Sequence, residues 1–100
     1  MAWINPKTLL RAQGQVARMA ASLRGAGFQS STLAALESEL NAEFELNEKT
    51  GWLVLPDPTL SRVRTLASKL ELLLQSRNAL YLVNPELPQL RYLLSTEVVG

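Results

Sequence analysis

The stretch "DPTLSRVRTLASKLELLL" (residues 57–74) predicts a long helix that faces the core. It opens with Asp57 as the N-cap and Pro58 at the first helical position, a combination that favours the start of a helix. Apolar residues then recur at helical spacing over a wide arc of the helical wheel: Leu60, Val63, Leu66, Ala67, Leu70, Leu73 and Leu74. Because the apolar arc is so wide, we expect this helix, which ends near residues 77–78, to organise the core.

The segment before this helix, "EFELNEKTGWLVLP", predicts a β-hairpin. With a five-residue loop from Asn47 to Gly51, Leu46 lies opposite Trp52. In the same register Phe44 lies opposite Val54, so these four side chains share one face. Aromatic and branched pairs across two strands stabilise a hairpin, which supports this register.

Two helices are predicted before the hairpin. The first begins at Asn5, a good N-cap, and ends at the glycine turn of residues 25–27. Its apolar residues form one stripe on a helical wheel: Leu9, Ala12, Val16, Met19 and Leu23. The second runs from Ser30 or Ser31 to about Ala42. Before the first helix, Trp3 and Ile4 are placed to pack its entry against the core.

The last quarter of the chain predicts two further strands. "ALYLV" (residues 79–83) is typical of a buried strand, and residues 84–88 form a turn rich in proline. "QLRYLLS" (residues 89–95) fits a fourth strand or a short helix, and we favour the strand because apolar runs flank the turn. The predicted order is α-α-β-β-α-β-β. The sequence therefore predicts one α+β domain over residues 1–100, with an antiparallel sheet packed on helices.

The composition argues against several classes of function. The chain has no cysteine, which excludes a disulfide, a zinc–thiolate site or a thiol nucleophile. It also has no histidine, the usual general base and a common metal ligand. We therefore expect no enzymatic activity, no cofactor and no metal site, with a carboxylate-dependent enzyme as a third interpretation. The apolar runs are far shorter than the roughly 20 residues that span a bilayer, so we expect no membrane span. The basic first helix also suits an anionic membrane surface, but its modest apolar side argues against that role.

Charge is distributed unevenly along the chain, although its net value is only +1. Residues 1–25 contain four cations and no acid, whereas residues 26–50 contain five acids and one cation. Two neighbouring helices of opposite charge attract each other. They can equally present a dipolar surface for self-association, in which the basic helix of one molecule meets the acidic helix of another.

The glycine turn and the helix after it raise the question of a DNA-reading helix-turn-helix. No basic residue lies between Arg24 and Lys49, and the acids there would be repelled by phosphates. The better nucleic-acid candidate is the basic face of the first helix, formed by Lys7, Arg11 and Arg18. Three cations on one face are also typical of a solvated surface, so we predict weak, non-specific nucleic-acid binding at most.

Three leucines occupy positions where the predicted structure meets solvent. Leu72 lies on the polar side of the third helix, and Leu53 and Leu55 point away from the face that carries Trp52. Several exposed apolar residues indicate either a sheet covered on both faces or a surface for a partner. We therefore predict a protein interface at Leu53, Leu55 and Leu72.

Together these observations predict a non-catalytic protein-interaction or assembly component, such as a small adaptor, inhibitor or structural subunit. We expect it to self-associate or bind a protein partner. The alternative is a nucleic-acid-binding regulator that uses Lys7, Arg11 and Arg18. We expect a cytoplasmic location and a bacterial or phage origin. The acid-free N-terminus is also typical of a mitochondrial presequence, so a mitochondrial location stays open, as does a virion-associated one.

Overall fold

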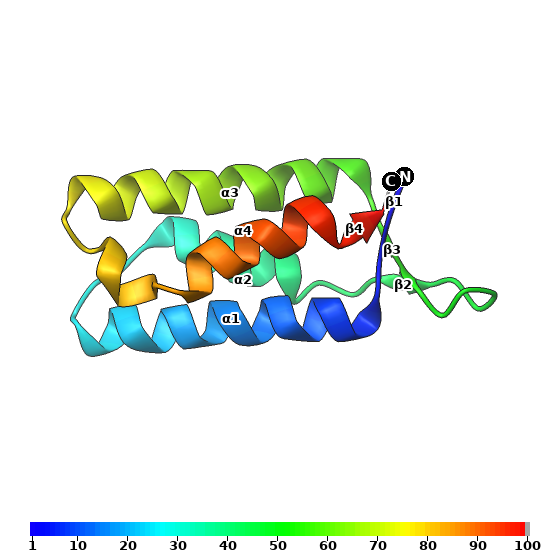
Figure 1. Cartoon of the computed structure of the whole chain (residues 1–100), viewed down its shortest axis with the longest axis horizontal. Helices are drawn as coiled ribbons and strands as arrows, with labels where there is room; N and C mark the ends of the chain where they lie inside the picture. Colours follow the sequence, from blue (N-terminus) through cyan, green and yellow to red (C-terminus); the bar gives the residue numbers. More distant parts are fainter. Residues whose placement is uncertain (100) are drawn as a thin grey trace.

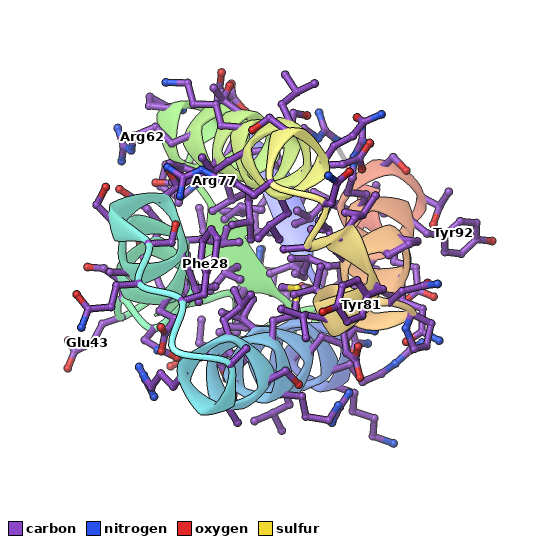
Figure 2. The ribbon with its side chains drawn as sticks, turned by 90° about the vertical axis from the view of Figure 1, so that its left-hand side faces the viewer. Phe28, Glu43, Arg62, Arg77, Tyr81 and Tyr92 are labelled. Atoms are coloured by element: carbon purple, nitrogen blue, oxygen red, sulfur yellow. The ribbon has the colours of Figure 1, made fainter. Side chains whose placement is uncertain are left out.

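The computed structural model of the chain describes residues 1–99. Four helices form a bundle, and a four-stranded sheet lies across one end of it (Figure 1). The helices are α1 (Pro6–Gly25), α2 (Ser31–Leu40), α3 (Asp57–Ser76) and α4 (Glu86–Thr96), with the short 3₁₀ helix η1 (Leu80–Val83) before α4. The strands are β1 (Ala2–Ile4), β2 (Glu45–Leu46), β3 (Leu53–Leu55) and β4 (Val98–Val99). Each of α1 and α3 contacts both α2 and α4, so the helices surround a common core (Figure 2). The predicted α+β class with an antiparallel sheet is confirmed.

Side-chain caps begin the first two helices where the sequence predicts them. The Oδ1 atom of Asn5 accepts a hydrogen bond of 2.9 Å from the backbone N–H of Lys7, at the start of α1. The Oγ atom of Ser30 accepts one of 3.2 Å from the backbone N–H of Leu33, at the start of α2. The predicted positions of both helices are confirmed, and α2 ends two residues earlier than expected, at Leu40.

The long helix α3 is also confirmed, with one change at its start. Asp57 is its first residue, and Pro56 occupies the N-cap position without a side-chain hydrogen bond. Asn78 ends the helix region with a φ of 55°, a left-handed conformation that asparagine tolerates better than most residues. Four residues of α3 are buried in the core: Val63, Ala67, Leu70 and Leu74.

The prediction of two C-terminal strands is wrong. Residues 80–83 form η1 instead of a strand, and residues 86–96 form α4. The buried residues of α4 are spaced as one helical face requires: Leu87, Leu90, Leu93 and Leu94. Pro88 lies in the first turn of α4, where a proline removes no helical hydrogen bond. Pro88, which we interpreted as part of a turn, therefore lies in the first turn of a helix.

Two strands of the sheet come from the ends of the chain and were not predicted. The strand order is β2-β3-β1-β4, and every neighbouring pair is antiparallel. Trp3 and Ile4, which we expected only to pack against the entry of the first helix, belong to β1. Ile4 is 1% exposed and lies in the core among residues from the helices, so the helices cover one face of the sheet.

The predicted register of the hairpin is wrong by one residue. Leu46 lies opposite Leu53, not opposite Trp52. The backbone N–H of Asn47 donates to the carbonyl of Trp52 (2.8 Å), and Gly51, with a φ of 72°, turns the chain between them. Because side chains alternate between the faces of a strand, this shift of one residue moves the side chains of β3 to the opposite face from the one predicted.

Candidate functional site

The face of the sheet that points away from the helices carries an apolar surface, which we call the tryptophan face. It consists of Trp3, Trp52, Val54 and Val99. Trp3 lies opposite Val54 on one side and opposite Val99 on the other, so these three side chains share a face. Trp52 precedes Val54 by two residues, which places it on the same side. The chain has only these two tryptophans, and the fold brings both of them to one surface.

The corrected register removes Leu53 and Leu55 from the outer surface where we predicted them. Leu55 is only 2% exposed, and Leu53 packs partly buried against the same core. Val54, between them, faces outward in their place. An apolar residue of β3 does face outward, as we predicted, but it is Val54 instead of Leu53 and Leu55.

A cleft of about 300 Å³ opens on the tryptophan face. It is lined by Trp3, Asn47, Thr50, Trp52 and Val99. Val99 is 53% exposed, and the two indole rings are half-buried. Asn47 and Thr50 add polar side chains to this mainly apolar lining, and many protein interfaces likewise combine apolar and polar groups.

Leu72 is 65% exposed, so its predicted position on the outside of α3 is confirmed. It does not join the tryptophan face. Fifteen residues separate it from Asp57 at the sheet end of α3, which corresponds to about 22 Å along a helix. The structure therefore does not combine Leu72 with the outer face of the hairpin into one surface.

The basic face of α1 is exposed as predicted, but one of its cations is paired. Lys7, Arg11 and Arg18 are all exposed. An Nη1 atom of Arg11 lies 3.3 Å from Oε2 of Glu97, which also accepts a hydrogen bond of 3.0 Å from the hydroxyl of Thr8. Glu97 follows α4, and its place beside α1 depends on the packing of these two helices.

A groove between α1 and α4, which we call the α1–α4 groove, was not predicted. Its volume is about 580 Å³, and it is lined by residues of both helices: Leu10, Arg11, Gly14, Gln15, Arg18, Pro88, Gln89, Tyr92 and Leu93. Leu10 and Tyr92 are 67% and 63% exposed, and Figure 2 shows Tyr92 pointing outward from α4. The groove exists only because residues 86–96 form a helix, so it could not be predicted while residues 89–95 were interpreted as a strand.

Gln15 is the most unusual residue that lines this groove. It is only 6% exposed, and its Nε2 atom donates to Oε1 of Gln89 over 3.2 Å. The Oε1 atom of Gln15 is buried and has no hydrogen-bond partner. A buried acceptor without a donor is costly, so the chain carries an unfavourable group beside this groove.

In the described part of the chain, no three acidic side chains are grouped so that they could hold a metal ion. Within the same residues no helix is both long and apolar enough to cross a membrane. Comparisons of the chain with protein-family models, curated proteins and solved structures find no match.

Proposed function

We propose that this chain is a non-catalytic protein-binding or assembly component, and that the tryptophan face is its docking surface. The supporting observation is that Trp3 and Trp52 lie together on the face of the sheet that the helices leave uncovered. Tryptophan is strongly enriched among the residues that contribute most to binding, because a large apolar ring with one N–H donor loses little conformational entropy on contact.

The surroundings of the two rings support a protein partner. Val54 and Val99 extend the apolar surface across the neighbouring strands, whereas Asn47, Thr50 and Glu45, which lies opposite Val54, add polar groups to it. An apolar centre with a polar rim is the usual organisation of a protein interface. The tryptophan face consists of four residues, whereas a standard interface uses roughly 20–30 residues on each side. The tryptophan face therefore suits a short segment of a partner better than a second broad domain.

The test compares two exposed apolar positions that lie on different surfaces. Val99→Asp places a charge on the tryptophan face, and Leu72→Asp places the same charge on α3. We expect Val99→Asp to reduce the amount of partner captured from cells of the source organism by about tenfold or more. Leu72→Asp is expected to capture as much as the unmodified chain. Equal capture by both variants contradicts the proposal, and a loss with Leu72→Asp alone places the interface on α3.

A further inference from the structure

The α1–α4 groove combines exposed apolar side chains, cations and one unpartnered polar atom. Its exposed apolar side chains, Leu10 and Tyr92, come from different helices and flank the same space. Gly14 of α1 also lines the groove and has no side chain, and a Cβ added there would lie 3.6 Å from Nη1 of Arg18. The unpartnered Oε1 atom of Gln15 lies in a residue that lines the groove.

The charge of the groove favours an acidic occupant. Arg18 lines it and forms no ion pair with any of residues 1–99. Arg11 lines it as well and shares its charge with Glu97. Lys7 lies on the same face of α1 and forms no ion pair within the described residues either. A negatively charged segment therefore gains attraction on the α1 side of the groove, chiefly at Arg18.

The chain itself carries such a segment, which we call the acidic arm: residues 43–50, in the hairpin that projects beyond the sheet (Figure 1). Glu45 and Glu48 are exposed and form no ion pair within residues 1–99. Leu46 lies between them and is 55% exposed, an unusual position for a large apolar side chain at the edge of a sheet. With three glutamates against Lys49, the acidic arm carries a net charge of −2, and it also presents the apolar side chain of Leu46.

The unpaired carboxylates of the acidic arm lie in different parts of the hairpin. Glu45 is in β2, and Glu48 is in the turn that follows it. Because Arg11 is already paired with Glu97, Arg18 and Glu48 are the two charges that the contact is expected to join. The strand β2 is at the edge of the sheet, so its outer backbone groups are free to bond to the groove.

We propose that the acidic arm of one copy docks in the α1–α4 groove of a second copy. The contact joins different molecules, because Glu43 and Tyr92 point to opposite sides of the same molecule (Figure 2). It is head to tail, since each copy offers an arm to one neighbour and a groove to another. The area that a short arm covers is below that of a standard interface, so the association is reversible and needs a high protein concentration. It goes beyond the proposed function, although the arm shares Asn47 and Thr50 with the cleft on the tryptophan face.

Sedimentation velocity over a wide range of protein concentration tests this contact. We expect reversible association that weakens by about tenfold or more when salt rises from about 0.05 M to about 0.5 M. Arg18→Glu and Glu48→Arg each reverse one charge of the predicted contact and are each expected to weaken association by about tenfold. Lys69→Glu, an exposed cation of α3 outside the groove, is the matched control and leaves the association unchanged.

Mixing the two variants gives the decisive result. Arg18→Glu has an acidic groove, and Glu48→Arg has a more basic arm, so the mixture restores complementary contacts that neither variant can form with itself. We expect equimolar Arg18→Glu and Glu48→Arg to associate nearly as well as the unmodified chain. An unmodified chain that stays monomeric at every concentration overturns the proposal, whatever else binds in the groove. It is equally overturned if the mixture fails to associate, or if Lys69→Glu weakens association as much as Arg18→Glu does.

Discussion

Ala2 and Leu55 lie directly opposite each other across the β1–β3 pair, and they are only 1% and 2% exposed. This pairing fixes which side of β3 faces the helices. We expect Leu55→Ala to lower the free energy of unfolding by about 2–4 kcal/mol, because it leaves a cavity in the core. Val54→Thr, on the opposite face of the same strand, is expected to change it by less than about 1 kcal/mol. Urea denaturation measures both, and similar losses in the two variants would show that the register is incorrect.

Two leucines of α3 provide a second test. Leu70 is fully buried, whereas Leu72 is 65% exposed. Leu70→Ala is expected to cost about 2–5 kcal/mol of unfolding free energy. Leu72→Ala is expected to cost less than about 0.5 kcal/mol, because it leaves no cavity. A loss below about 0.5 kcal/mol for Leu70→Ala contradicts the packing of α3.

The unpartnered acceptor of Gln15 predicts a stabilising substitution. Gln15→Leu removes a buried oxygen without a donor, and Gln89, which is exposed, can bond to water instead. We expect the free energy of unfolding to rise by about 1 kcal/mol. Gln13→Leu is the control, because the Nε2 atom of Gln13 donates to the carbonyl of Leu40 over 2.7 Å. That variant is expected to lose about 1 kcal/mol. If Gln15→Leu lowers the free energy of unfolding by a similar amount, the Oε1 atom of Gln15 does have a hydrogen-bond donor, and the prediction is wrong.

Nucleic-acid binding through α1 is expected to be weak. The ion pair between Arg11 and Glu97 neutralises one of the three cations on the basic face of α1. The two that remain, Lys7 and Arg18, can bind few phosphates. We expect duplex and single-stranded DNA to bind no tighter than about 10 µM at physiological salt, without sequence preference. Fluorescence anisotropy with labelled oligonucleotides checks this. Sub-micromolar, sequence-dependent binding that persists in added salt would support the regulator that we considered as the alternative.

The parts of the fold that the sequence predicts are those determined by neighbouring residues. The hydrogen bonds of Asn5 and Ser30 cap helices within three residues of themselves, so the cap and the apolar stripe after it locate α1 and α2. The exposed position of Lys7, Arg11 and Arg18 follows equally from the period of the helix.

The parts that it does not predict depend on contacts between distant residues. Two strands of two or three residues, at the ends of the chain, are too short to show an alternating pattern, and Ala2 meets Leu55 only through the fold. The tryptophan face was missed for the same reason. Trp52 belongs to it with Trp3 and Val99, whereas the predicted register grouped Trp52 with Phe44 and Leu46. The α1–α4 groove was missed because Pro88 was interpreted as part of a turn.

Site-specific cross-linking tests the central claim, that the tryptophan face is the docking surface, most directly. A photoreactive amino acid is placed at Val99 in one variant and at Leu72 in another, because both positions are exposed and lie on different surfaces. After irradiation in cells of the source organism, we expect a discrete cross-linked protein from position 99 and none from position 72. The cross-linked product is expected to disappear when the position-99 variant also carries Trp52→Ser. Circular dichroism checks that this double variant keeps its folded structure. Cross-linking from position 72 alone, or a product at position 99 that Trp52→Ser leaves unchanged, would contradict the claim.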